Sequence, residues 1–135
     1  MATIRREVHI QADPDQVWDA LRDVGALHTR VCPGFVVDTK MDGDARLVTF
    51  ANGSTARELI VSVDDSARRV AWAIVDKPFV HYNGAAQVVA LPDRTCRFIW
   101  ISDVLPNELE PSIAAMIEAG IADIKKTQES AHKAR

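Results

Sequence analysis

The chain has 135 residues, of which 47% are hydrophobic and 26% are charged, and its formal net charge is −3. This length suits one domain with a sizeable buried core, so residues 1–135 are treated as a single domain. The charge balance offers no concentrated basic surface, which argues against nucleic acid as a partner. No apolar run approaches the roughly 20 residues of a membrane span and no secretory signal is evident, so we expect a cytoplasmic protein.

The first predicted element is a strand over residues 3–10, in which apolar and polar side chains alternate. A helix should follow, because Asp13 can cap its start and Pro14 suits its first position. Gln16, three residues after Asp13, completes the spacing of a capping box. Residues 26–31 are expected to form a second, short helical turn.

Six further segments favour β-strand, because they are rich in β-branched and aromatic residues. Turn signals built from Gly, Asn, Asp and Pro separate them. Since these links are short, neighbouring strands must run antiparallel. The six segments are residues 35–41, 45–50, 55–64, 68–75, 80–91 and 96–105.

A long helix is predicted from about residue 108 to residue 132. Its apolar residues recur at helical spacing and form one stripe. Gly120 lies on that stripe, although a glycine inside a helix costs about 1 kcal/mol relative to alanine. The missing side chain at Gly120 therefore predicts that another group occupies this space. The candidates are a bound ligand and the indole ring of Trp72 or Trp100. The stripe comprises Ile113, Met116, Ile117, Ile121 and Ile124.

An antiparallel sheet must bury one face, and the last helix carries the only large apolar stripe available to cover it. We therefore predict an α+β fold. In this fold a curved antiparallel sheet of about seven strands wraps around a long C-terminal helix, and two short helices follow the first strand. Such a shell tends to leave space between the helix and the concave face of the sheet.

The order of elements, the segment ADPDQVWDAL after the first strand and the segment RELIVSVDDSARRVAWAI all resemble the SRPBCC superfamily, whose fold is the START-like or pollen-allergen-like helix grip. Within it, the chain most resembles the bacterial polyketide cyclase/dehydrase and lipid-transport group. The resemblance implies a cavity. Members of the superfamily bind lipids, hormones and polyketides, and some act as cyclases, hydroxylase components or stress-response co-factors. The resemblance also places His28 in the short helical stretch that closes one mouth of the cavity.

Strand alternation predicts which side chains face this cavity. In the segment 55–64, the apolar residues Leu59, Val61 and Val63 should face inward, which puts Arg57 in line with them. The last three strands give inward rows that mix aromatic and small residues, as expected for the wall of a pocket. These rows are Val70, Trp72 and Ile74; Tyr82, Gly84, Ala86 and Val88; and Cys96, Phe98, Trp100 and Ser102.

Three of the polar candidates have two possible roles. Arg57 either pairs with a surface carboxylate or orients an anionic or carbonyl ligand. Tyr82 either satisfies its hydroxyl within the core or hydrogen-bonds the ligand. His28 is either a surface residue or a ligand contact. The predicted ligand-binding set is Arg57, Trp72, Tyr82, Phe98, Trp100, Met116, Ile117, Gly120 and His28.

No carboxylate is predicted to face inward, and no nucleophile elbow, P-loop, dinucleotide fingerprint or metal-ligand motif occurs, so neither a cofactor nor a metal is expected. Cys32 and Cys96 are predicted to be reduced and buried. The sequence favours the binding or transport of a small, largely apolar molecule, such as a lipid, polyketide or aromatic metabolite, by a monomer or homodimer. One alternative is a cyclase or dehydratase that uses Tyr82, Arg57 and His28. Another is a co-chaperone-like module that binds a protein partner.

Overall fold

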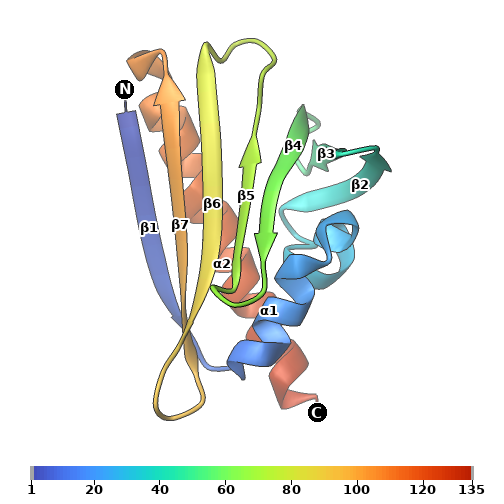
Figure 1. Cartoon of the computed structure of the whole chain (residues 1–135), viewed down its shortest axis with the longest axis vertical. Helices are drawn as coiled ribbons and strands as arrows, with labels where there is room; N and C mark the ends of the chain where they lie inside the picture. Colours follow the sequence, from blue (N-terminus) through green and yellow to red (C-terminus); the bar gives the residue numbers. More distant parts are fainter. Residues whose placement is uncertain (1, 135) are drawn as a thin grey trace.

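Seven antiparallel strands form one curved sheet, and a long helix packs across its concave face (Figure 1). The computed structural model describes residues 2–134. The strands lie in the order β1-β7-β6-β5-β4-β3-β2, which confirms the predicted α+β helix-grip fold. Their bounds are β1 Ala2–Ile10, β2 Val36–Asp42, β3 Ala45–Phe50, β4 Thr55–Asp64, β5 Arg69–Ala73, β6 His81–Ala90 and β7 Cys96–Leu105.

The first helix, α1, spans Pro14–Arg22 and begins as predicted, because the Asp13 carboxylate accepts a hydrogen bond from the Asp15 amide at 2.8 Å. The predicted capping box is only half formed. The Gln16 side chain is buried and donates instead to the carbonyl oxygen of Gln128 at 3.0 Å. A buried amide needs a partner, and Gln16 finds one on the last helix rather than at its own N-terminus.

Two short helical turns, η1 (Val24–Ala26) and η2 (Leu27–Val31), connect α1 to the sheet. The loop after them is tied to the last helix, because the Gly34 amide donates to Asp123 Oδ2 at 2.9 Å. A Cβ atom at Gly34 would lie only 2.6 Å from Asp123 Oδ1, so any larger residue here would displace the Asp123 carboxylate.

The last helix, α2, spans Glu110–Lys133 and follows a 3-10 turn, η3, at Asn107–Leu109. It begins two residues later than predicted because this turn takes up the first predicted residues. Its predicted apolar stripe is largely buried: Ile113, Ile117, Ile121 and Ile124 all lie in the core. Within residues 2–134, no helix is long and apolar enough to cross a membrane.

The inward rows predicted for β5, β6 and β7 are correct, and Trp100, although only half-buried, faces the same side as the rest of its row. The row predicted for β4 is wrong along most of the strand. Arg57 pairs with Leu47 on the outer face, whereas Glu58 pairs with Arg46 and Ile60 with Trp72 on the inner face. Opposite residues of an antiparallel pair share a face of the sheet.

A β-bulge explains the error on β4. The register shifts between Ile60 and Ser62, and Val61, at the bulge, is 65% exposed. Beyond the bulge, Val63 pairs with Val70 on the inner face, but it is 40% exposed and does not line the cavity. A bulge moves the side chains of one part of a strand to the other face relative to a regular alternation. The continuous apolar run at residues 59–61 gave no alternation from which the bulge could be recognised.

Candidate functional site

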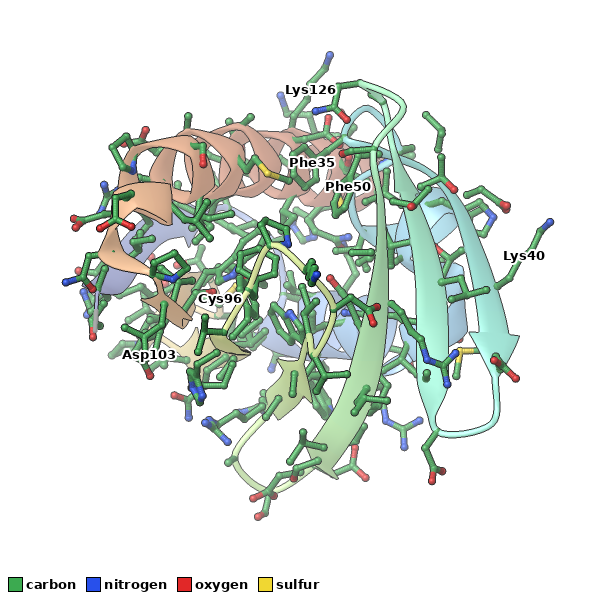
Figure 2. The ribbon with its side chains drawn as sticks, turned by 90° about the horizontal axis from the view of Figure 1, so that it is seen from above. Phe35, Lys40, Phe50, Cys96, Asp103 and Lys126 are labelled. Atoms are coloured by element: carbon green, nitrogen blue, oxygen red, sulfur yellow. The ribbon has the colours of Figure 1, made fainter. Side chains whose placement is uncertain are left out.

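A cavity of about 270 Å³ lies between α2 and the concave face of the sheet. Seen from above, α2 lies along one side, β2 to β4 curve round the other, and Phe35 and Phe50 lie between them (Figure 2). The rings of Phe35 and Phe50 meet edge to face, with their centroids 5.3 Å apart. Most of the remaining lining is also aliphatic or aromatic. A concave, mostly apolar space with a few polar groups is the usual form of a small-molecule site.

The structure brings six of the nine predicted site residues to this cavity: Trp72, Tyr82, Phe98, Trp100, Met116 and Ile117. Arg57, His28 and Gly120 are not part of its lining. The six residues that line the cavity come from strands whose alternation is regular and from a regular helix. The three others need separate explanations.

Arg57 lies on the outer face of β4, where its side chain is 38% exposed and donates from Nη1 to Asp42 Oδ2 at 2.7 Å. The first of its two possible roles, pairing with a surface carboxylate, is therefore the one that the structure shows. His28 lies in η2, but that turn contributes Leu27 and Val31 to the cavity wall instead. The prediction that Arg57 faces the cavity is wrong, because the β4 bulge was not anticipated.

The space left by Gly120 is filled by aromatic rings of the protein. A Cβ atom at this position would lie 2.9 Å from Trp100 Cζ3 and 3.1 Å from Phe35 Cε2. Gly84 seats the other indole in the same way, since its Cβ would lie 2.7 Å from Trp72 Cε2. The two indoles meet edge to face at 6.0 Å. Of the two possibilities for the Gly120 gap, an indole ring and not a ligand is therefore what the structure shows.

An ion pair that sequence reasoning missed lies in the cavity wall. Arg46 Nε donates to Glu58 Oε1 at 2.8 Å, and the two side chains are only 4% and 8% exposed. Arg46 also donates to the Val24 carbonyl oxygen at 3.2 Å and lies over the Trp72 ring, 5.6 Å from its centroid. The sequence could have indicated that Arg46 faces inward, because Arg46, Val48 and Phe50 are two residues apart along β3 and therefore lie on the same face of the strand.

Tyr82 supplies a hydroxyl group to the cavity. Its Oη lies 2.9 Å from Ser102 Oγ, and Tyr82 and Ser102 are 7% and 0% exposed. Burial raises the pKa of Tyr82 to about 12, so its hydroxyl is protonated at neutral pH. The indole N–H groups of Trp72 and Trp100 are also buried, and neither has an acceptor at full hydrogen-bond geometry among residues 2–134.

The chemistry available in the cavity is limited to a few groups. Among residues 2–134, Arg46 and Glu58 are the only charged residues in its lining, and they form an ion pair with each other. Cys32 also lines it, but burial raises the pKa of this thiol to about 12, which keeps it from acting as a thiolate nucleophile. Across residues 2–134, no group of three or more His, Cys, Asp or Glu side chains could hold a metal ion.

Comparison with known proteins gives one family and many similar folds. The family model described as polyketide cyclase/dehydrase and lipid transport matches residues 1–129. A protein from Thermobifida fusca is 25% identical, with a TM-score of 0.80 and coverage of 99% of this chain and 95% of that one. A search of curated proteins found no match.

Two of the similar structures carry functional descriptions. A point mutant of norcoclaurine synthase from Thalictrum flavum, in complex with a transition-state analogue, is 20% identical, with a TM-score of 0.75 and coverage of 98% of this chain and 96% of that one. The di-domain ARO/CYC protein BexL, from the BE-7585A biosynthetic pathway, is 15% identical with a TM-score of 0.78. That alignment covers 94% of this chain and 46% of BexL. Identities this low show a shared fold.

Proposed function

This chain belongs to the polyketide cyclase/dehydrase and lipid transport family, and from that premise we propose that it binds a small, largely apolar molecule in the cavity under α2. The observation that carries the proposal is the cavity itself, which is lined mainly by aliphatic and aromatic side chains. Its volume of about 270 Å³ lies just below the roughly 300–1,000 Å³ that is usual for small-molecule sites. A molecule of a few rings or one short chain fits this volume better than a two-tailed lipid.

The aromatic walls favour a flat ligand. Phe35, Phe50, Phe98, Trp72 and Trp100 all line the cavity. Aromatic side chains prefer edge-to-face or offset-stacked partners, so a planar ring system would gain contacts that a flexible acyl chain would not. We therefore place aromatic metabolites and aromatic polyketides ahead of acyl lipids within the proposed ligand class.

The proposal is tested by titrating the protein with N-phenyl-1-naphthylamine, a neutral fluorophore that brightens in apolar surroundings. Two neighbouring residues of β6 provide a matched pair of variants: Ala86 lines the cavity, whereas Ala85 lies on the other face of the strand. Ala86→Phe should fill the cavity and weaken binding about tenfold or more, which corresponds to about 1.4 kcal/mol. Ala85→Phe should bind like the wild type.

Two results would count against the proposal. One is the absence of any fluorescence change with the wild-type protein. The other is equal binding by the wild type and both variants, which would place the probe elsewhere. Circular dichroism of Ala86→Phe is needed as a control, because overpacking of a core typically costs 1–3 kcal/mol.

A second candidate function, a cyclase or dehydratase, is favoured by one observation. The Glu58 carboxylate lies in the cavity wall together with the Tyr82 hydroxyl, and a carboxylate near a hydroxyl can serve general acid–base chemistry. This function predicts that an aromatic polyketide precursor is turned over by the wild type and that Glu58→Gln binds it without turnover. Binding without turnover by the wild type would remove this candidate.

A further inference from the structure

We propose that the molecule bound in the cavity presents a neutral carbonyl-type oxygen to the hydroxyl group of Tyr82. This inference rests on the proposed function, because it describes the ligand of the same cavity. Three features carry it: the direction of the Tyr82 proton, the charge balance of the cavity wall, and the neutral character of the other hydrogen-bond donors in that wall.

The direction of the Tyr82 proton follows from hydrogen-bond satisfaction. Tyr82 Oη and Ser102 Oγ are 2.9 Å apart, and either could donate. Ser102 is completely buried and has no other side-chain hydrogen bond among the described residues. If Tyr82 donated, the Ser102 proton would be buried without an acceptor, which costs about 1–3 kcal/mol. A free Tyr82 proton can reach an acceptor in the cavity, because Tyr82 lines the cavity and Ser102 does not, so the arrangement in which Ser102 donates to Tyr82 is favoured.

Tyr82 is then left with its own proton to donate. Tyr82 lines the cavity, and its oxygen interacts with Ser102 and also with the indole groups of Trp72 and Trp100, whose N–H groups can only donate and so cannot accept its proton. The ring is held in place by Phe79, which meets it edge to face at 4.9 Å. A fixed hydroxyl with a free proton at a cavity wall is suited to an acceptor atom on the ligand. Ser102 is a positioning residue in this arrangement.

The charge balance indicates a neutral acceptor rather than an anion. Arg46 is the only cation in the lining, and its Nε is already bonded to Glu58. A ligand carboxylate would enter a buried space in which Glu58 repels it and no free cation compensates for its lost hydration. Burial also keeps Tyr82 protonated, with its pKa raised to about 12. A ketone, quinone or lactone oxygen accepts a hydrogen bond without bringing a charge.

The other side-chain donors in the cavity wall are neutral, as the Tyr82 hydroxyl is. The indole N–H groups of Trp72 and Trp100 are neutral and buried, and within the described part of the chain neither has an acceptor at full hydrogen-bond geometry, although both interact with the Tyr82 hydroxyl. Trp72 is 5% exposed, and both indoles belong to the lining. Together with Tyr82, they place three neutral N–H or O–H donors in this wall. An acceptor atom on the ligand would pair with these donors.

Three probes of similar shape test this inference. 2-Acetylnaphthalene carries the ketone oxygen, 2-isopropenylnaphthalene replaces that oxygen by CH₂, and 2-naphthoate carries a carboxylate. Competition with N-phenyl-1-naphthylamine measures their affinities. The ketone should bind about 3- to 10-fold more tightly than the alkene, the range expected for one neutral hydrogen bond. The naphthoate should bind more weakly than either.

The variants locate the effect at Tyr82. Tyr82→Phe/Ser102→Ala removes both hydroxyls, so that no buried group loses its partner, and should bind ketone and alkene equally. Ser102→Ala should reduce the ketone-to-alkene affinity ratio without abolishing it. Met116→Ala changes an apolar part of the wall and should leave the ratio unchanged. The ratio is the useful quantity, because a loss of folded protein affects both probes alike.

Each outcome has one meaning. A ketone preference that disappears in Tyr82→Phe/Ser102→Ala supports the inference. Equal binding of ketone and alkene by the wild type overturns it and leaves the proposed function standing, as does a preference that persists in the double variant. Tightest binding of 2-naphthoate also overturns it. If none of the three probes nor the fluorophore binds, the proposed function itself fails.

Discussion

Arg46 on β3 and Glu58 on β4 are directly opposite each other, and their side chains form a 2.8 Å ion pair inside the cavity wall. A buried pair of this kind contributes little net stability, because both charges have lost their hydration. It does impose a penalty when one member is removed, since the other charge is then buried alone. Its Arg46 side chain also covers the Trp72 ring.

The first prediction concerns this pair. Arg46→Ala should lower the free energy of unfolding by about 3–5 kcal/mol, because it leaves Glu58 buried and unpaired. Arg57→Ala, one position along the same strand pair, breaks a partly exposed ion pair with Asp42 and should cost about 1 kcal/mol or less. Urea unfolding of both variants measures the difference. Equal losses would show that the Arg46–Glu58 pair is not buried in solution.

The second prediction concerns Gly120. In an open helix, replacing glycine by alanine gains about 1 kcal/mol. Here the new methyl group would meet Trp100 at 2.9 Å, so Gly120→Ala should fail to stabilise the protein, and Gly120→Leu should destabilise it by about 1–3 kcal/mol. The displaced indole should also reduce probe uptake.

Ala119 provides the control for this prediction, since it is the exposed neighbour of Gly120 on α2. Ala119→Gly should cost about 1 kcal/mol through helix propensity alone and leave probe binding unchanged. Thermal unfolding of the three variants is the measurement. A stabilised Gly120→Ala protein would mean that Trp100 does not occupy the gap.

The third prediction is a loss of stability at alkaline pH. Burial raises the pKa of Tyr82 from 10.0 to about 12, that of Cys32 from 9.0 to about 12 and that of Cys96 from 9.0 to about 11. The unfolded chain therefore releases these protons at lower pH than the folded protein. The free energy of unfolding should fall as pH rises above 9, and Tyr82 should contribute to the fall between pH 10 and 12.

Tyr82 is the only tyrosine of the chain, so tyrosinate absorbance reports this residue alone. In the folded protein the absorbance should rise only well above pH 10, and in urea it should rise near pH 10. The contrary result, an ordinary titration in the folded protein, would mean that the hydroxyl is solvated and not enclosed beside Ser102.

The regular parts of this fold could be predicted from the sequence. Alternation placed Trp72, Tyr82 and Phe98 on the inner face, because β5, β6 and β7 have no register shift between them. The errors come from features that alternation does not encode. The β4 bulge was not anticipated, so Arg57 was assigned to the wrong face, and the partner of Gln16 lies on an element distant in the sequence.

The buried ion pair between Arg46 and Glu58 is a further feature that strand alternation alone could not predict. A charged residue in a strand is ordinarily assigned to solvent, because charges are rarely buried without a partner. Arg46 is buried only because Glu58 lies opposite it, and that pairing depends on the register of β3 against β4. Register is a tertiary property, set by turns and bulges together.

The central claim is that a small apolar molecule enters the space beside Trp72 and Trp100, and the indole N–H signals of the protein test it directly. The chain has three tryptophans, so a ¹H–¹⁵N spectrum should contain three such signals. Trp18 is an internal control, because it does not line the cavity and its N–H is already bonded to Asp65 Oδ1 at 3.0 Å. On titration with 2-acetylnaphthalene, the signals of Trp72 and Trp100 should move and that of Trp18 should stay in place. If all three stay in place at saturating probe, or if Trp18 alone moves, the cavity is not the binding site.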